Sequence, residues 1–239
     1  MFVEVCANSF QSALNAQNTG ADRIELCSEL AVGGITPSYG LLKVVMQTLE
    51  IPVNVLIRPR SGNFSYSEEE FNIMKEDILL CKELGCAGIV SGILNKDNTI
   101  DMERTKELVE LTKPMSFTFH RGFDWTPNAI NSLKELSDIG VDRILTSGQQ
   151  KTAIEGLETL QKLLEISDNK IVIMPGGGIK AENILLFKEA GFKEIHFSGT
   201  AKPAQKEVKV PMNSHNLLYE IDHPVSDPQL LKKMIGLVK

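Results

Sequence analysis

Two short apolar segments near the start of the chain carry carboxylate and thiol side chains at alternate positions, namely Glu4, Cys6, Glu25 and Cys27. Side chains alternate between the two faces of a β-strand, so each segment has one apolar face and one polar face. Glu4 and Glu25 occupy equivalent positions in the two segments, as do Cys6 and Cys27, and we expect each pair to match on neighbouring strands. A carboxylate in such a cluster can act as a general base, and paired thiolates suit a soft metal ion.

Cationic and imidazole side chains follow two later apolar segments. Arg58 and Arg60 end one segment, and His120, Arg121 and Asp124 end the other. We expect Arg58 and Arg121 to hold an anionic group, and His120 to move a proton. Asp124 is expected either to orient His120 or to pair with Arg121. The acids and bases at these segment ends form the set of groups that a proton-transfer enzyme would need.

Charges that face the inside of a folded chain must be paired or must contact a ligand, because an unpaired buried charge is costly. A salt-bridge network that plugs the interior is therefore one interpretation of these residues. A ligand site is the other, and we favour it because the charges gather where several segments end.

Glycine-rich turns follow the last two apolar segments. One contains Gly177 and Gly178 after Pro175, and the other contains Ser198 and Gly199. Glycine lets the backbone N–H groups approach an anion closely, so the two turns predict a phosphate-binding site. Tight strand-to-helix turns without a ligand remain the alternative.

The elements that must position these residues recur along the whole chain. Four copies of Gly-x-x-x-Ile begin at Gly20, Gly85, Gly140 and Gly191, each after a helical stretch and before an apolar segment. A helix that ends on glycine and leads directly into a buried strand is typical of parallel α/β folds. We predict strands at 2–6, 22–27, 53–58, 86–91, 115–119, 142–146, 170–174 and 194–198. Helices are predicted at 9–18, 67–84, 102–111, 129–139, 154–167 and 181–189.

Eight strand–helix units without a linker favour a closed (β/α)8 TIM barrel over a doubly wound open sheet. In a barrel the apolar face of each strand meets the helices, so the carboxylates and thiols above point into the interior. We predict a single domain over residues 1–239, with a barrel core to about residue 200. The irregular extension at 201–239 is expected to hold a long loop at 202–211 and a last helix from Asp227-Pro228 to about Leu237.

The composition narrows the class of protein. The 239 residues carry a net charge of −6, which argues against a nucleic-acid or anionic-membrane surface. No apolar run is as long as a membrane span, and because the first residues look like a strand without a basic region, we expect no signal peptide. The four cysteines include no CxxC pair. We therefore expect a cytoplasmic protein with reduced thiols.

Motifs distributed over residues 2 to about 200 resemble those of the CutC family. The motifs are Glu4-Val-Cys6, Arg23-Ile-Glu25-Leu-Cys27, Gly33-Gly-Ile-Thr36-Pro-Ser38, Arg58-Pro-Arg60, Phe119-His120-Arg121-x-Phe-Asp124, Ile144-Leu-Thr-Ser147-Gly148 and Pro175-Gly-Gly-Gly178-Ile. The resemblance implies a cytoplasmic TIM barrel for copper homeostasis, with copper cysteines at Cys6 and Cys27, and it suggests a homo-oligomer. It also puts Ser147 among the ligand-binding candidates. Ser61, Asn63 and Gly122 depart from the residues common in the family.

Two functions follow from these observations. The first is Cu(I) binding at the barrel mouth by Cys6 and Cys27, with His120 as a further ligand. The second is an isomerase or lyase that acts on a phosphorylated small molecule, with Glu4 or Glu25 as general base. We leave His196, His215 and His223 without a role, although His196 is expected to point into the barrel.

Overall fold

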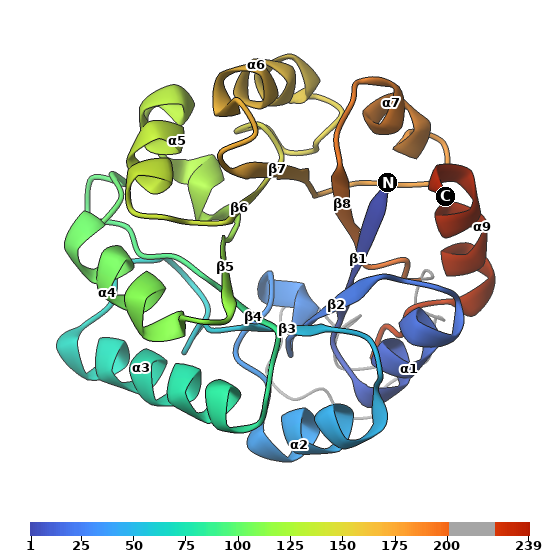
Figure 1. Ribbon diagram of the computed structural model, residues 1–239, viewed down its shortest axis with the longest axis horizontal. Helices are drawn as coiled ribbons and strands as arrows, with labels where there is room; N and C mark the ends of the chain where they lie inside the picture. The colour runs from blue at the N-terminus through green and yellow to red at the C-terminus, as the bar shows by residue number, and fades with distance from the viewer. Residues whose placement is uncertain (201–222) are drawn as a thin grey trace, which may run out of the picture.

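The computed structural model describes residues 1–200 and 223–239, and it shows eight parallel strands surrounded by helices (Figure 1). The strands are β1 (Phe2–Ala7), β2 (Arg23–Leu26), β3 (Val53–Leu56), β4 (Gly88–Ser91), β5 (Ser116–Phe119), β6 (Arg143–Thr146), β7 (Val172–Pro175) and β8 (Glu194–Phe197). Their order is β7-β6-β5-β4-β3-β2-β1-β8, and the end strands β7 and β8 lie side by side. The sheet therefore closes almost completely, and the predicted (β/α)8 barrel is confirmed.

Helices cover the outside of the barrel. They are α1 (Phe10–Asn18), α2 (Tyr39–Thr48), α3 (Glu68–Glu83), α4 (Met102–Thr112), α5 (Ala129–Asp138), α6 (Leu157–Ser167), α7 (Ile184–Glu189) and α9 (Pro228–Val238), with 3-10 turns η1 (Leu30–Val32) and η2 (Arg121–Trp125). Helix α9 packs between α1 and α7, with the Asp227 carboxylate as its N-cap. The predicted last helix is thus confirmed, whereas the loop predicted at 202–211 lies outside the described residues. The single-domain division of the chain stays a prediction.

Glycine ends four of the helices, as the repeated motif predicts. Gly20, Gly85, Gly140 and Gly191 have φ values of +90°, +78°, +81° and +89° and follow α1, α3, α5 and α7. This left-handed conformation ends the helix and turns the chain directly into the next strand. The motif therefore marks alternate strand–helix units of the barrel.

The sequence interpretation missed α2. This helix begins after Ser38, whose hydroxyl accepts a hydrogen bond from the Leu41 N–H, and it buries Leu42 and Val45. The Val44-Val45 pair and Thr48 are β-branched and favour a strand locally, but burial against the barrel outweighs that preference. Helices α6 and α7 also begin three residues later than predicted, at Leu157 and Ile184.

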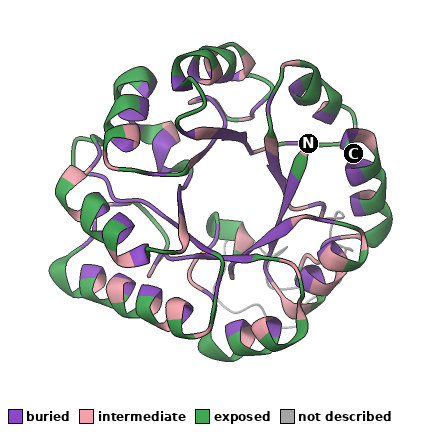
Figure 2. Cartoon of the chain, viewed as in Figure 1, coloured by how far each residue is buried: buried purple, intermediate pink, exposed green. Residues whose placement is uncertain are grey.

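The packed core lies between the strands and the inner faces of the helices (Figure 2). Val3, Val5, Ile24 and Leu26 belong to this core, whereas Cys6 and Cys27 fall in a separate small cluster inside the barrel. The predicted inward direction of the polar face of β1 and β2 is confirmed. None of the helices in the described ranges is long and apolar enough to cross a membrane.

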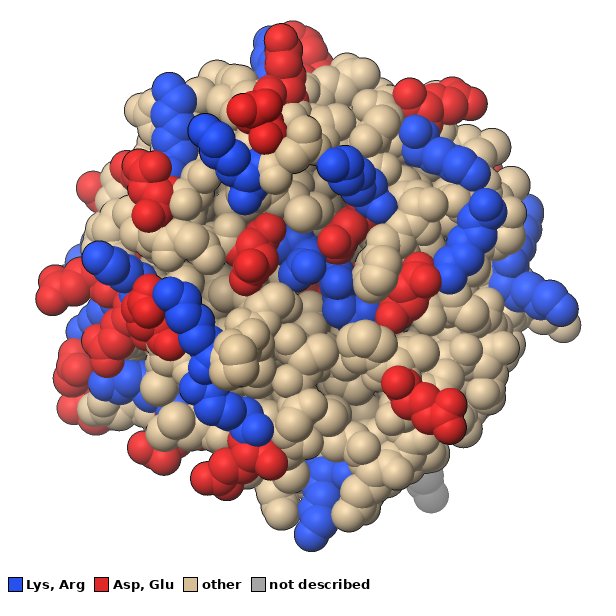
Figure 3. Space-filling view, in the orientation of Figure 1, with Lys and Arg blue, Asp and Glu red and all other residues tan. Residues whose placement is uncertain are grey.

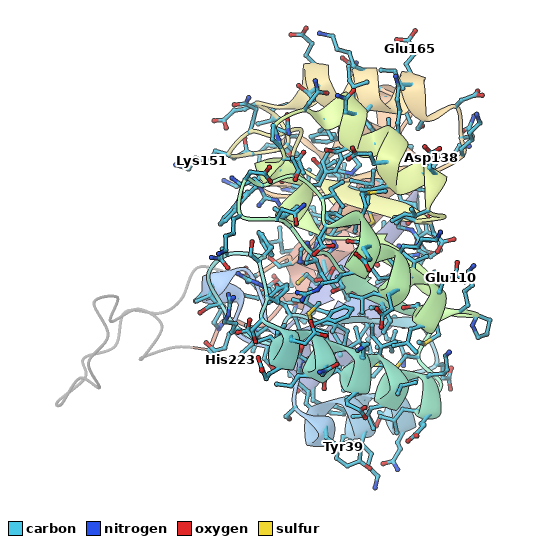
Figure 4. The ribbon with its side chains drawn as sticks, turned by 90° about the vertical axis from the view of Figure 1, so that its left-hand side faces the viewer. Tyr39, Glu110, Asp138, Lys151, Glu165 and His223 are labelled. Atoms are coloured by element: carbon cyan, nitrogen blue, oxygen red, sulfur yellow. The ribbon has the colours of Figure 1, made fainter. Side chains whose placement is uncertain are left out.

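The two ends of the barrel differ, and a side view separates them (Figure 4). Lys151, which follows β6, and His223, which precedes α9, lie on one side. Glu110 and Asp138, near the C-terminal ends of α4 and α5, lie on the opposite side. The first side is the face where the strands end.

Candidate functional site

The register of β1 and β2 corrects one prediction. Glu4 pairs with Arg23, and Cys6 pairs with Glu25. The expected matches of Glu4 with Glu25 and of Cys6 with Cys27 are wrong by two residues. Strands in a closed barrel tilt and stagger, so equivalent sequence positions on neighbouring strands sit at different depths. Because the stagger is two residues, the side chains keep the predicted face.

Ion pairs fill the end of the barrel where the strands begin. Arg23 donates from Nε to Glu4 Oε2 at 2.5 Å and from Nη2 to Glu194 Oε2 at 2.6 Å. Arg143 Nε donates to the same Glu194 oxygen at 2.9 Å. Opposite charges therefore meet at the centre of the face shown in Figure 3. We call Glu4, Arg23, Arg143 and Glu194 the charged plug.

Glu4 belongs to this plug. Its side chain is fully buried, and it also bonds His196, whose Nδ1 lies 2.8 Å from Glu4 Oε1. Burial alone would raise the pKa of Glu4, but the charge of Arg23 and the hydrogen bond to His196 lower it to about 2. Glu4 is thus a permanently ionised anchor for its partners. The salt-bridge interpretation holds for this residue.

A cavity of about 800 Å³ opens at the other end, where the strands finish. Most of the predicted site residues line it: Cys6, Glu25, Arg58, His120, Arg121, Gly177, Gly178, Ser198 and Gly199. Five predicted residues do not line it: Glu4, Cys27, Arg60, Asp124 and Ser147. Parallel barrels place their active sites at this end, so the cavity is the candidate site.

Two thiols meet beside the cavity, and Cys6 is the one of the pair that lines it. The sulfur atoms of Cys6 and Cys27 are 3.7 Å apart, and both cysteines are free and buried. The contact with Cys27, burial and the nearby carboxylates Glu25 and Glu4 all raise the pKa of Cys6 well above its ordinary value. The Cys6 thiol therefore stays protonated at neutral pH until a cation replaces the proton.

Glu25 is the carboxylate that faces the cavity. Its Oε1 accepts a weak hydrogen bond from Cys6 Sγ at 3.9 Å, and its buried Oε2 has no partner among residues 1–200 and 223–239. Burial raises the pKa of Glu25 to about 7, although the charge of His196 opposes the shift. A carboxyl with this pKa can both take up and release a proton near neutral pH.

His196 joins this group from β8. One ligand atom from each of Cys6, Glu25 and His196 lies within 4.8 Å of the other two, and all three residues are buried. Burial lowers the pKa of His196, but Glu25 and Glu4 outweigh this effect and raise it. The three side chains bring a sulfur, an oxygen and a nitrogen donor to one point.

His120 lies in another part of the cavity wall. Its Nδ1 accepts a hydrogen bond from the Gly122 N–H at 3.1 Å, and its buried Nε2 has no partner in the described part of the chain. Burial, followed by the charge of Arg58, lowers the pKa of His120 to about 3. The imidazole is therefore neutral at physiological pH. Its proposed role as a proton carrier stays a prediction.

Arg58 and Arg60 use most of their donors to bond nearby loop residues. Arg58 Nη1 donates to the carbonyls of Val32 and Gly34, each at 2.7 Å, and Nη2 donates to the carbonyl of Gly62 at 2.8 Å. Arg60 pairs with Glu70 at 2.5 Å and lies outside the cavity wall. Anion binding by these two residues stays a prediction, and most of their donors are already used.

Arg121 and Asp124 form an ion pair at the cavity rim. Arg121 Nε donates to Asp124 Oδ2 at 2.8 Å, and Nη2 donates to Ser147 Oγ at 2.7 Å. Of the two partners considered for Asp124, the structure therefore gives Arg121. Asp124 and Ser147 lie outside the cavity wall and hold the Arg121 side chain that lines it.

A family model gives the chain its place among known proteins. The model of the CutC family matches residues 1–201. The chain belongs to the CutC family. Its barrel, as described above, falls almost entirely within the matched region.

Relatives of this CutC-family chain extend the comparison. The family protein CutC of Salmonella paratyphi A is 46% identical over 196 residues, which are 82% of this chain and 79% of the relative. A solved structure named for copper homeostasis, CutC of Streptococcus agalactiae, is 39% identical with a TM-score of 0.79, covering 83% of this chain and 98% of that one. Thiamine phosphate pyrophosphorylase of Pyrococcus furiosus shares the fold alone, with 15% identity, a TM-score of 0.61, and coverage of 99% and 94%.

Two residues of this CutC-family site were not among the predicted site residues. His196 alternates with Ile195 and Phe197 along β8, so strand periodicity correctly predicted its direction but not its partners. Trp125 is half-exposed, lines the cavity and meets Phe64 edge-on, with ring centroids 4.9 Å apart. No strand periodicity applies to Trp125, because it ends the turn η2.

Proposed function

We propose that this CutC-family chain binds Cu(I) in the barrel mouth through Cys6 and Cys27. The observation that carries the proposal is the 3.7 Å separation of two buried thiols that form no disulfide. Thiolate sulfur is a soft donor and suits Cu(I). The name of the Streptococcus agalactiae relative, which refers to copper homeostasis, adds support.

The surroundings of the thiols also suit a cation. His196 supplies a third donor beside Cys6, whereas His120 is outside the described group of clustered donors. The carboxylates of Glu4 and Glu25 raise the pKa of Cys6, and the same negative charges favour a bound positive ion. Because the thiols must release their protons, binding should tighten as the pH rises.

Anaerobic titration with Cu(I) against a competing chelator tests the proposal. We expect tight, stoichiometric binding to the wild type and at least about a 100-fold loss of affinity in Cys6→Ser/Cys27→Ser, because a hydroxyl is a poor ligand for this ion. Cys81→Ser/Cys86→Ser is the matched control, since these buried cysteines lie outside the cavity wall. Equal loss in both double variants, or no loss in the first, would contradict a site at Cys6 and Cys27.

A second function is favoured by the size and the unpartnered groups of the cavity. A volume of about 800 Å³ fits a small molecule and far exceeds the needs of one ion. Glu25 Oε2 and His120 Nε2 are buried without partners in the described part of the chain, and both residues line this cavity. Buried polar atoms are normally hydrogen-bonded, so a bound ligand would satisfy them. We infer acid–base chemistry on a phosphorylated small molecule, with Glu25 as the base.

Hydrogen exchange into the ligand tests the second function before any product is known. Candidate phosphorylated metabolites are incubated with the protein in D2O, and loss of a C–H signal is followed by proton NMR. We expect exchange in the wild type. In Glu25→Gln, which cannot accept a proton, we expect the exchange rate to fall by at least about 100-fold. Cys81→Ser is the control, because Cys81 is a buried cysteine outside the cavity wall. Absence of exchange across phosphorylated ligands that bind would count against proton abstraction.

A further inference from the structure

One cation at the cavity rim is held in a fixed orientation. Asp124 accepts hydrogen bonds from the backbone N–H groups of Ser147 and Gln149 and from the Thr146 hydroxyl. The same carboxylate pairs with Arg121 Nε, while Arg121 Nη2 is tied to Ser147. Asp124 is nearly buried, with 6% of its side chain exposed, whereas Arg121 is 43% exposed. A buried and saturated carboxylate thus fixes an accessible guanidinium.

The guanidinium lies directly against the glycine turn after β7. A Cβ atom placed on Gly177 would come within 3.1 Å of both Cζ and Nη1 of Arg121. Gly177 and Gly178 have φ values of +96° and +74°, so the absence of side chains permits both the conformation and the close approach. An alanine at 177 would therefore crowd the guanidinium and require it to shift by a few tenths of an ångström.

Hydrogen-bond donors remain free at this contact. Arg121 Nη1 donates to no group in residues 1–200 and 223–239, and neither do the backbone N–H groups of Gly177, Gly178 and Ile179. Consecutive N–H groups in a glycine turn form a concavity that binds anions, and a guanidinium matches the oxygens of a phosphate group. Lys180 lines the same cavity and adds positive charge, while Glu182 is an exposed acid beside it.

We propose that Arg121 and the N–H groups of Gly177 and Gly178 form the binding site for the phosphate group of a phosphate monoester. The inference rests on the second proposed function and deepens it. One cavity is lined by this rim site and by Glu25 and His120, so a ligand anchored by its phosphate can extend to the unpartnered acid–base groups. Asp124 and Ser147 are positioning residues that act through Arg121.

Binding of inorganic phosphate, followed by calorimetry at low ionic strength, tests the site. We expect binding to the wild type and at least tenfold weaker binding to Arg121→Gln and to Gly177→Ala. Arg104→Gln is the matched arginine control, because Arg104 pairs with Glu68 outside the cavity wall. Gly191→Ala is the matched glycine control, since it imposes the same left-handed strain where nothing lies within 4 Å. Circular dichroism checks that each variant is folded.

The outcomes separate this inference from the acid–base function. Phosphate affinity that is the same in Arg121→Gln as in the wild type, or lowered equally in Arg104→Gln, would overturn the rim site. Wild-type protein that binds no phosphate at about 10 mM would also overturn the rim site. Glu25→Gln should keep its phosphate affinity. Phosphate binding that depends on Arg121, without hydrogen exchange, would support the rim site while the acid–base function fails.

Discussion

The carboxylates of Glu4 and Glu25 lie on neighbouring strands inside the barrel, but they differ in charge state because their partners differ. Glu4 meets the guanidinium of Arg23 and the imidazole of His196, and its pKa falls to about 2. Glu25 is equally buried, but no hydrogen bond to Arg23 reaches it, and its pKa rises to about 7. The same residue type therefore serves as a fixed anion at one depth and as a titratable group at the next.

The raised pKa of Glu25 predicts a pH dependence of stability. The folded chain binds this proton more tightly than the unfolded chain, so the group favours folding below about pH 4.5, its ordinary pKa. That contribution is lost as the pH rises to about 7. Glutamine mimics the protonated form and avoids the loss.

Urea unfolding at pH 5 and pH 8 checks this prediction. We expect the free energy of unfolding of Glu25→Gln, relative to wild type, to increase by at least about 1 kcal/mol between the two pH values. Glu165→Gln, on the exposed face of α6, serves as the control and should show no such change. A difference independent of pH would mean that Glu25 is already ionised at pH 5.

At the scale of the residue, strand periodicity predicted directions but not partners. Alternation along β1 and β2 correctly placed Glu4, Cys6, Glu25 and Cys27 inside the barrel. It could not show that Glu4 pairs with Arg23, because register depends on the tilt of the whole sheet. The sulfur atoms of Cys6 and Cys27 still meet, since the stagger moves each side chain without changing its face.

At the scale of the element, local capping signals correctly marked the starts of two predicted helices. Ser67 caps α3 in a capping box with Glu70, and Asn128 caps α5, both at predicted helix starts. Helix α2 was missed although Ser38 caps it, because its β-branched residues favour a strand locally. Its buried residues Leu42 and Val45 join the core, and α2 also packs against α1, which no local pattern records.

The loops after the strands also depend on distant groups. Arg58 donates to backbone carbonyls on both sides of it, including Gly34 and Gly62. From sequence this arginine looked like a ligand for an anion, because an unpaired cation beside a strand end is expected to bind one. Backbone carbonyls carry no sequence signal, and they take up most of its donors here.

At the scale of the molecule, the barrel has one charged and closed end and one open end. The charged plug fills the end where the strands begin, while the cavity opens at the end where they finish. Access to Cys6 and Glu25 is therefore from the side where the strands finish. The fold was predictable from the repeated strand–helix units. Which side chains lie in the plug and which line the cavity depends on the stagger between neighbouring strands, which the sequence pattern does not show.

The plug predicts a large stability effect of one arginine. Arg23→Met removes the shared partner of Glu4 and Glu194 and leaves Glu4 buried with a reduced set of donors. We expect the free energy of unfolding to fall by about 3 to 5 kcal/mol, as for other broken buried pairs. Chemical denaturation at neutral pH measures the change.

Two further variants make the comparison specific. Arg23→Met/Glu4→Gln should recover part of the loss, because the uncompensated carboxylate is gone. Lys162→Met, which breaks an exposed pair with Glu158 on α6, should leave stability unchanged within error. A loss in Arg23→Met no greater than in Lys162→Met would show that the plug contributes little.

The hydrogen bonds of the two inward-facing histidines assign them opposite tautomers. The Gly122 N–H points at Nδ1 of His120, so this neutral ring carries its proton on Nε2. The ionised Glu4 can only accept, so His196 carries a proton on Nδ1. When His196 is neutral, its Nε2 lone pair is left for a cation or a proton, whereas His120 presents an N–H. His196 therefore faces the cavity as a hydrogen-bond acceptor and His120 as a donor, although both are the same residue type.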